Sequence, residues 1–552
     1  MVKSSWSQGF SRTLWFLFYL TVFVFLLQHS FSFLDPDFGW HLRLGQEIAS
    51  TGQVPSVNYS NYTLFGEQWV DHEWLSNLTV YRIYTNFGYS TLNLIFCLIP
   101  LLILIILNLL LRYEFKLDLR RYVWPLILFE SFALIAVAPH LGVRVQEVTM
   151  LFFLFLLLII FFYNKNKNNL ILWCLLPLFY LWANLHGGFL MGLVVLLLFA
   201  IVKGIELFVQ QKYNWPFLNF ARTLSKRQIM IFVGFALLAF ATTLLTPYHL
   251  QLYSFLSSYG NTFYLNHISE WMPQWAFPYQ YWQFAYISIL ILALSFLAID
   301  IFRKKQIKLD LWEGALLLSF LLLAIKSRRH FPLLFIVSMP WLFNFWLEYL
   351  GFKGRERIRL AEILKNKFID PIFQISVILV WLVLIFNLYL GIKFTNQPFL
   401  SFCEDKYQAA RSRFLYPCQA LEFLKSKPEL SQLRLLNNFN WGGYLLWQYP
   451  TKQLFIDGRM PQVNFRGRSI LEEYFDFFKK DKLAAKLKEH KIELILINNQ
   501  PNRIKLNIFE KKFLLINEEE INKKNEFLDY LASAPDWLLL YSDQVSLIYK
   551  KR

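Results

Sequence analysis

Two carboxylates stand directly after the first hydrophobic segment of the chain, on either side of a proline. Asp35 and Asp37 flank Pro36, and His41 and Arg43 follow shortly afterwards. A carboxylate at the edge of a membrane is costly unless it is solvated, paired or used in function. One acid is enough to cap a helix or to mark the water boundary, so two acids followed by an imidazole favour a functional site. A carboxylate at such a site can accept a proton from a hydroxyl group as a general base.

Other acidic, imidazole and basic side chains occur in segments that we predict on the same side of the membrane. They are His72, Glu73, Arg144, His186, Arg328, Arg329 and His330. The basic cluster at 326–330 either extends its side chains to lipid headgroups or binds a phosphate, since guanidinium groups match phosphate oxygens. The segment 182–188 interrupts an apolar stretch with Asn, His and paired Gly. Its histidine is either packed in the core or faces a cavity.

Acids, imidazoles and bases at one membrane face suit the transfer of a sugar. In an inverting transfer, the acceptor attacks the anomeric carbon opposite the leaving group, and Asp35 or Asp37 would take the acceptor's proton. If the leaving group is a lipid phosphate, the outer arginines would stabilise its developing charge. The same acids and a phosphate make a possible Mg²⁺ or Mn²⁺ site at Asp35 and Asp37. We expect the substrate to be bound by His41, Arg43, His72, Glu73, Arg144, His186, Arg328, Arg329 and His330.

The composition indicates that these groups belong to a polytopic membrane protein. Of 552 residues, 56% are hydrophobic, and the mean hydropathy is +0.37. Apolar runs predict about eleven transmembrane helices, at about 20 residues per crossing. The runs lie near 13–34, 91–111, 123–139, 148–163, 170–183, 189–209, 229–246, 284–302, 311–325, 331–350 and 372–393. The first run is too long for a cleaved signal peptide and has no small-residue cleavage site, so we expect a retained anchor.

The distribution of the net charge of +17 predicts the orientation. With the N-terminus in the cytoplasm, nearly every predicted inner loop carries Lys and Arg, as the positive-inside rule requires. Residues 35–90, 247–283 and everything after 394 then lie outside the cytoplasm. Helical spacing of aromatic and aliphatic residues within 39–51 and 71–84 predicts amphipathic helices in the first outer loop. No basic patch alternates with aromatic residues on a soluble face, so we expect no nucleic-acid partner.

The composition changes after residue 394, where charge rises and apolar runs shorten. Short strands are predicted at 433–439, 453–456, 493–497, 537–541 and 545–549, and helices at 469–489 and 522–531. This alternation is typical of a small α/β domain, and it has neither a GxGxxG motif nor a Walker loop. Cys403 and Cys418 could pair in an oxidising compartment or remain free thiols. Residues 441–444 and 457–459 form either a polar functional face or glycine-containing turns, and we favour turns.

Taken together, these segments resemble the GT-C superfamily of polytopic glycosyltransferases, which use polyprenyl-phosphate-linked sugars. The resemblance covers essentially the whole chain and is closest to a set of prokaryotic membrane members. The matching segments are 35–45 (Asp-Pro-Asp-Phe-Gly-Trp-His-Leu-Arg-Leu-Gly), 68–75, 142–147, 182–189, 327–330, 440–444 and 456–461. The resemblance implies a catalytic acid at the end of the first membrane helix, which matches Asp35 and Asp37. It also implies a lipid-phosphate pocket of outer basic residues, with Arg144, Arg328 and Arg329 as candidates.

The chain departs from two patterns of that superfamily. The Trp-Trp-Asp signature of oligosaccharyltransferases is missing, and Asp-Pro-Asp stands where protein O-mannosyltransferases have adjacent Asp and Glu. These departures leave the sugar, the acceptor and the metal dependence open.

We therefore expect an α-helical polytopic membrane protein, with a transmembrane domain over 1–393 and an extracytoplasmic α/β domain over 394–552. The expected function is transfer of a hexosyl or pentosyl group, by an inverting reaction, from a polyprenyl-phosphate carrier to a glycan, lipid or protein acceptor at a prokaryotic plasma membrane. The rival interpretation is a transporter or flippase of a lipid-linked glycan, which would use the basic pocket without bond chemistry. A third is a non-catalytic scaffold for envelope assembly.

Overall fold

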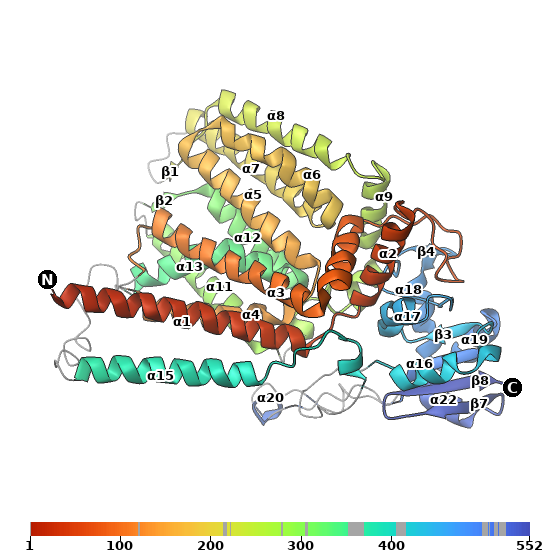
Figure 1. Cartoon of the computed structure of the whole chain (residues 1–552). Coiled ribbons are helices and arrows are strands. Elements are labelled where there is room, and N and C mark those ends of the chain that lie inside the picture. Colours follow the sequence, from red (N-terminus) through yellow and green to blue (C-terminus); the bar gives the residue numbers. More distant parts are fainter. Residues whose placement is uncertain are drawn as a thin grey trace.

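The computed structural model describes residues 2–119, 122–212, 218–220, 222–277, 280–303, 307–350, 369–403, 416–499, 506, 508–512, 517 and 526–552. Long helices form a bundle, and a small domain that contains a sheet lies at one end of it (Figure 1). A helix occupies each apolar segment that the sequence predicts. These helices are α1 (Val2–Ser32), α3 (Trp74–Glu114), α4 (Val123–Val137), α5 (Gln146–Asn166), α6 (Leu175–Leu185), α7 (Phe189–Lys212), α8 (Lys226–Thr243), α11 (Tyr281–Phe302), α12 (Leu311–Lys326), α13 (Phe331–Tyr349) and α15 (Ile369–Leu390).

Among the described residues, eight helices are long and apolar enough to cross a membrane. The prediction of a multi-pass membrane protein is therefore confirmed, while the count of eleven spans stays a prediction. α1 and α15 lie side by side along one edge of the bundle (Figure 1). The short parallel strands β1 (Leu218–Phe220) and β2 (Ile307–Leu309) lie at the end of the bundle far from the small domain.

The first outer loop folds mainly as helix. α2 (Phe38–Thr51) ends at Gly52, which adopts a left-handed conformation and donates its N–H to the Ile48 carbonyl. Its apolar face, which includes Trp40 and Leu44, is buried, as helical spacing predicts. The second predicted amphipathic segment is the first part of α3, which is interrupted at Gly88 by a non-helical conformation. Two short helices, α9 (Gln251–Ser257) and α10 (Thr262–His267), follow α8, and a 3-10 turn at Arg328–His330 precedes α13.

The C-terminal region is an α/β domain, as predicted. Its sheet has the order β3-β6-β8-β7, in which β3 pairs parallel with β6 and the other pairs are antiparallel. The strands are β3 (Leu435–Asn437), β6 (Leu494–Asn498), β7 (Trp537–Ser542) and β8 (Ser546–Lys551), with a small hairpin of β4 (Asn464–Phe465) and β5 (Arg468–Ser469). The helices are α16 (Cys418–Lys425), α17 (Gly442–Gln448), α18 (Ile470–Phe475), α19 (Leu483–Glu489), α20 (Ile508–Lys512) and α22 (Glu526–Ser533). Cys403 and Cys418 form a disulfide.

One strand prediction in this domain is wrong. The segment 453–456 joins no named strand, because Leu454 pairs instead with the first outer loop. The Leu454 N–H donates to the Ser60 carbonyl (2.9 Å), and the Tyr62 N–H donates to the Leu454 carbonyl (3.1 Å). The short apolar run that predicts a sheet strand therefore serves an inter-domain contact.

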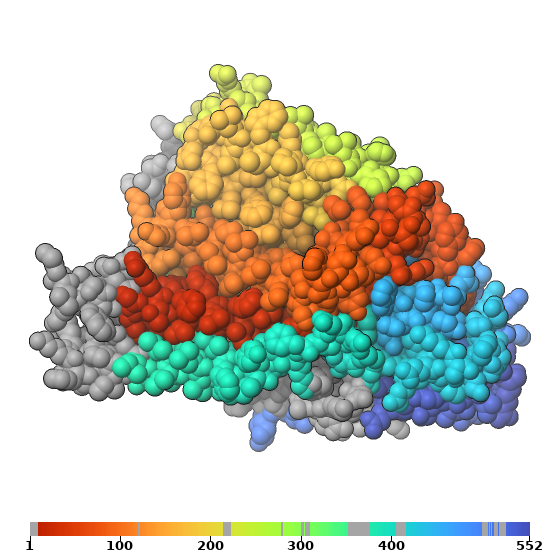
Figure 2. Space-filling model, in the orientation of Figure 1, coloured from red at the N-terminus to blue at the C-terminus, as the bar shows by residue number. Residues whose placement is uncertain are grey.

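Arg459 fastens the α/β domain to the first outer loop. This buried guanidinium donates to the side-chain oxygens of Asn58 and Asn61 at 3.1 Å each, and it forms an ion pair with Asp457 at 2.8 Å. The segment around α2 and the start of α3 therefore lies directly against the C-terminal domain, as the space-filling view shows (Figure 2).

Candidate functional site

A cavity of about 330 Å³ lies where the bundle meets the α/β domain. Its lining comes from segments that are far apart in the sequence: the first outer loop, the starts of α5 and α7, the loop that holds α9 and α10, the start of α13, and the C-terminal domain. The polar lining residues are Asp37, His72, Glu73, His140, Gln146, Thr149, His186, Tyr259, Tyr264, Arg329 and His330. Of the predicted site residues, the structure thus brings Asp37, His72, Glu73, His186, Arg329 and His330 into one cavity.

Asp35 and Asp37 have different surroundings. Asp35 Oδ2 forms an ion pair with Arg144 Nε at 2.6 Å, and Asp35 Oδ1 accepts the Asp37 backbone N–H at 2.9 Å. Asp37 lines the cavity, next to Trp40 and Gly458. Burial raises the pKa of Asp37 to about 8, and the negative charge of Asp35 adds to this rise. Asp37 is therefore a carboxyl group that can exchange a proton near neutral pH, whereas Asp35 is held by a cation.

Alternating charges connect Asp35 to the cavity. Arg144 contacts Asp35 and also Glu270, whose Oε1 lies 3.0 Å from Arg144 Nη1. Glu270 Oε2 lies 3.6 Å from Arg329 Nη1, and the Arg329 backbone N–H donates to the Glu270 carbonyl at 2.9 Å. Burial favours the protonated form of Glu270, but Arg144 and Arg329 outweigh it and lower the pKa of this carboxyl group. The series joins four outer segments, and its last member, Arg329, carries positive charge into the cavity.

Glu73 faces two imidazoles. Its Oε1 lies 3.3 Å from His186 Nε2 and 3.5 Å from His72 Nε2. Burial raises the pKa of Glu73 to about 8. Burial and the charge of Arg329 lower the pKa of His72 to about 3. Near neutral pH both imidazoles are therefore uncharged and contact Glu73 as neutral groups.

A buried polar group lies behind Glu73. Asn77 Nδ2 donates to both carboxylate oxygens of Asp71 at 2.8 Å, and Asn77 Oδ1 lies 2.5 Å from His41 Nδ1. An amide oxygen only accepts, so His41 Nδ1 carries the hydrogen of this bond. Glu73 Oε2 lies 4.0 Å from the same nitrogen. His41 thus supports the cavity from behind and does not line it.

Two other predicted binding residues lie away from the cavity lining. Arg43 donates to Gln46 on the same face of α2 at 3.0 Å. Arg328 is buried and its guanidinium lies over the ring of Phe277, 4.1 Å from the centroid. Both were predicted to bind the substrate. In the structure Arg43 is instead bonded to its neighbour on α2, and Arg328 is stacked on an aromatic ring.

Several lining residues were not predicted. Tyr259, Tyr264 and Trp271 form an aromatic wall, and the guanidinium of Arg329 lies 4.9 Å from the centroid of the Trp271 ring. Thr149 lies inside an apolar run and had no visible signal. Aromatic side chains offer large apolar surfaces, and those of Tyr and Trp also carry a polar end, so the aromatic content of the segment 259–271 was the available clue to a binding wall.

Two contacts hold the His186 ring, and a further hydrogen bond fixes one of the two partners. The Gly188 backbone N–H donates to His186 Nδ1 at 2.9 Å, and Thr149 Oγ1 lies 2.7 Å from the same nitrogen. The Trp182 indole N–H donates to Thr149 Oγ1 at 2.9 Å. Burial, followed by the charge of Arg329, lowers the pKa of His186 well below its usual value. The segment 182–188 thus builds a cavity wall, which resolves the alternative left open by its sequence.

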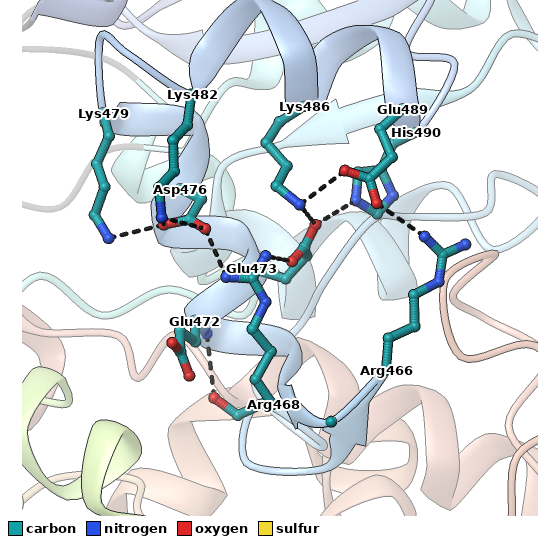
Figure 3. Close-up of polar contacts among 12 residues, drawn as sticks. Arg466, Arg468, Glu472, Glu473, Asp476, Lys479, Lys482, Lys486, Glu489 and His490 are labelled. Atoms are coloured by element: carbon teal, nitrogen blue, oxygen red, sulfur yellow. Dashed lines mark hydrogen bonds and ion pairs between the residues drawn. The ribbon is translucent and has the colours of Figure 1, made fainter.

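Among the described residues, one group of three side chains could hold a metal ion, and it lies in the α/β domain. Ligand atoms of Glu473, Glu489 and His490 are within 4.8 Å of one another. Figure 3 shows that Glu473 already has several partners. It accepts hydrogen bonds from Lys486 at 2.6 Å and from His490 at 2.7 Å, and it forms an ion pair with Arg468. Burial favours protonated Glu473, but these hydrogen bonds outweigh it and lower the pKa. The cluster is therefore built as an ion-pair network.

The predicted metal pair, Asp35 and Asp37, has one carboxylate engaged by Arg144. A divalent cation at this pair would have to compete with that guanidinium for Asp35, while Asp37 offers its oxygens to the cavity. Carboxylate oxygens are the ligand type that Mg²⁺ and Mn²⁺ prefer. The metal site stays a prediction.

No protein-family model and no curated protein matches the sequence. The chain is similar to solved structures of an archaeal oligosaccharyltransferase from Archaeoglobus fulgidus. The structure tethered to an acceptor peptide with an NVT sequon has 11% identity and a TM-score of 0.44, over 98% of this chain and 74% of that chain. The complex with an inhibitory peptide and a dolichol-phosphate has 12% identity and a TM-score of 0.45, over 100% of this chain and 74% of that chain. At this level of similarity the function of this chain has to be argued from its own residues.

Proposed function

We propose that the protein is a membrane glycosyltransferase, which moves a sugar from a polyprenyl-phosphate carrier to an acceptor. One observation carries the proposal: a cavity at one end of a membrane helix bundle combines proton-accepting carboxyl groups with a guanidinium group. Sugar transfer from a phosphate needs both, because the acceptor loses a proton while the leaving oxygen gains negative charge.

In this proposal Asp37 is the general base. It accepts the proton of the acceptor hydroxyl while the acceptor oxygen bonds to the anomeric carbon, and the bond from that carbon to the phosphate oxygen breaks. The elevated pKa of Asp37, about 8, supports the assignment because a base is most effective when its pKa is near the working pH. Asp35 is then a positioning residue, since Arg144 holds its carboxylate.

Arg329 would meet the leaving phosphate. The guanidinium lines the cavity and is only 28% exposed at its side chain, so its charge acts in a partly water-excluded site. Leu190, Met191 and Leu333 line the same cavity and offer apolar contacts to the first units of a polyprenyl chain. The phosphate pocket predicted for Arg144, Arg328 and Arg329 is thereby narrowed to Arg329 as the direct contact.

The remaining details belong to the same proposal. The transferred group is a hexose or pentose, the reaction is inverting, and the acceptor is a glycan, lipid or protein outside the cytoplasm. Lys and Arg concentrate in the predicted cytoplasmic loops when the N-terminus is cytoplasmic. An odd number of spans, such as the predicted eleven, would then support an extracytoplasmic α/β domain. The alternative role for Asp37 is to hold a divalent cation, which would add charge stabilisation for the phosphate but would prevent this carboxylate from acting as the base. The competing function is a flippase, which the same basic cavity would also serve.

The test is release of polyprenyl phosphate by the full-length protein in liposomes. The donors are a panel of polyprenyl-phosphate hexoses and pentoses, and a membrane extract supplies acceptors. Asp37→Asn should lower kcat by about 10²- to 10⁴-fold, the range that general-base catalysis contributes. Asp536→Asn, which changes an exposed acid of the α/β domain, is the matched control and should transfer normally.

Two results would overturn the proposal. Equal transfer by wild type and Asp37→Asn would remove the assigned base. Movement of the donor across the bilayer without release of polyprenyl phosphate, with every sugar offered, would establish the flippase instead.

A further inference from the structure

The contacts around His186 determine which of its nitrogens carries the hydrogen. A backbone N–H can only donate, so the bond from Gly188 makes His186 Nδ1 an acceptor. Thr149 must then donate its hydroxyl hydrogen to the same nitrogen, at 2.7 Å. The Trp182 indole is a donor only, and it occupies a lone pair of the Thr149 oxygen at 2.9 Å. All three contacts therefore agree on one arrangement.

It follows that neutral His186 carries its hydrogen on Nε2. That nitrogen lies 3.3 Å from Glu73 Oε1, so this oxygen is a nearby acceptor for its N–H. Arg329 Nη2 lies 3.4 Å from the same nitrogen. Because His186 Nε2 carries a hydrogen in this arrangement, it cannot accept one from Arg329. The positive charge of Arg329 instead disfavours protonation of the imidazole.

Close packing protects this arrangement. A β-carbon on Gly188 would collide with the Thr149 side chain, and one on Gly187 would press on His72 and Leu256. The paired glycines thus let the wall of the cavity approach Thr149 closely. This close approach explains why glycine stands at both positions 187 and 188.

The two carboxyl oxygens of Glu73 differ in their distance to the neighbouring imidazoles. Oε1 meets His186 and His72, whereas the nearest imidazole nitrogen to Oε2 is His41 Nδ1, at 4.0 Å. That nitrogen already gives its hydrogen to Asn77. Glu73 lines the cavity, so its carboxyl group is accessible to a bound molecule, and Oε2 is the oxygen that has no imidazole contact closer than 4.0 Å.

We propose that Trp182, Thr149 and His186 are positioning residues that orient Glu73, and that Glu73 accepts a hydrogen bond from a hydroxyl group of the sugar on the donor. The inference rests on the proposed function for the identity of the ligand. It adds a sugar-binding carboxylate, separate from the base, and a series of side chains that acts through it.

The test measures binding rather than transfer, so that it can fail independently of the proposed function. The ligands are one polyprenyl-phosphate hexose and the same polyprenyl phosphate without a sugar. Both are titrated into full-length protein in nanodiscs. At pH 9, where Glu73 is mostly ionised because its pKa is about 8, Glu73→Gln should weaken binding of the sugar-bearing lipid about tenfold, as expected for a lost hydrogen bond to a charged group, and leave the bare lipid unchanged.

Thr149→Val tests the positioning series. It should weaken binding of the sugar-bearing lipid in the wild-type background, and Thr149→Ser should restore it because serine keeps the hydroxyl donor. In the Glu73→Gln background, Thr149→Val should have no further effect, since the two residues act in series. The control is Thr246→Val, because the Thr246 hydroxyl is buried and has no hydrogen-bond partner among the described residues.

Three results would overturn the inference. The first is that wild type binds the sugar-bearing lipid no more tightly than the bare lipid. The second is that Thr149→Val and Glu73→Gln multiply in effect. The third is that Thr149→Ser fails to restore binding while Thr246→Val binds normally. Tight, sugar-dependent binding without any transfer would instead count against the proposed function alone.

Discussion

Gly39 at the start of α2 and Gly443 at the start of α17 touch backbone to backbone. A β-carbon on Gly39 would collide with the carbonyl group of Gly443, and one on Gly443 would collide with the Pro36 carbonyl oxygen. Because Pro36 stands between the two acids, this contact sets the distance between the α/β domain and the proposed base.

Gly443→Ala should therefore separate α17 from α2 and displace Asp37. Over-packing of this kind lowers the free energy of unfolding by about 1–3 kcal/mol. The rate of transfer should also fall under conditions in which the variant is still folded. Thermal unfolding and polyprenyl-phosphate release measure the two effects. Gly204→Ala is the matched control, because a β-carbon there meets nothing within 4 Å. Normal melting and normal transfer by Gly443→Ala would show that the contact has slack.

Removal of one partner from the Asp35–Arg144 pair should be more harmful than removal of both. Arg144→Gln leaves Asp35 and Glu270 without their shared cation, and breaking a buried pair costs about 3–5 kcal/mol. Asp35→Asn together with Arg144→Gln should cost less than the sum of the single changes. Melting of the four proteins gives the coupling. Arg466→Gln, which changes an exposed arginine, should melt like wild type. Strictly additive losses would contradict the pairing.

Transfer should rise with pH and reach half of its maximum near pH 8. The pKa of Asp37 is raised to about 8 by burial and by Asp35, so the base form is scarce at pH 6 and dominant at pH 9. The imidazole of His72 does not contribute, since its pKa is lowered to about 3. Glu73 lines the same cavity and its pKa is also raised to about 8, so Glu73→Gln is measured in parallel to isolate the titration of Asp37. A pH series of kcat/KM checks this.

The same experiment has an internal check in Asp35→Asn. Loss of the Asp35 charge removes a repulsion that raises the pKa of Asp37, so the midpoint should move to lower pH. A midpoint that stays fixed, or a rate that falls with rising pH, would assign the titration to another group.

Arg459→Lys should loosen the first outer loop from the α/β domain. Lysine cannot reproduce the guanidinium fork that contacts Asn58 and Asn61, and hydrogen bonds to a charged group contribute about 1.5–3 kcal/mol. Hydrogen exchange of residues 56–70 should accelerate. Arg466→Lys is the control at an exposed arginine. Unchanged exchange in Arg459→Lys would mean that strand-like pairing with Leu454 alone holds the loop.

Helices and outer clusters were predictable because they depend on local pattern. Apolar runs located the helices, and helical spacing identified the buried face of α2 through Trp40 and Leu44. The cavity brings Asp37, Glu73 and Arg329 together, which agrees with the prediction that they lie on one side of the membrane.

The rest depended on tertiary contacts that leave no local trace. Asp35 and Asp37 look equivalent in sequence, and only the approach of Arg144 from another loop separates them. Thr149 reads as an interruption of an apolar helix until Trp182 and His186 are seen beside it. The segment 453–456 is a short apolar run typical of a strand, yet its partner is a loop almost at the other end of the chain.

The series Asp35–Arg144–Glu270–Arg329 also bears on the order of events during synthesis. Asp35 leaves the ribosome first, and its countercharges follow only after several further helices have been inserted. Gly458, which completes the cavity beside Asp37, arrives later still. A partly synthesised or truncated chain therefore contains the two acids without the complete pocket, which forms only when nearly the whole length has been translated and folded.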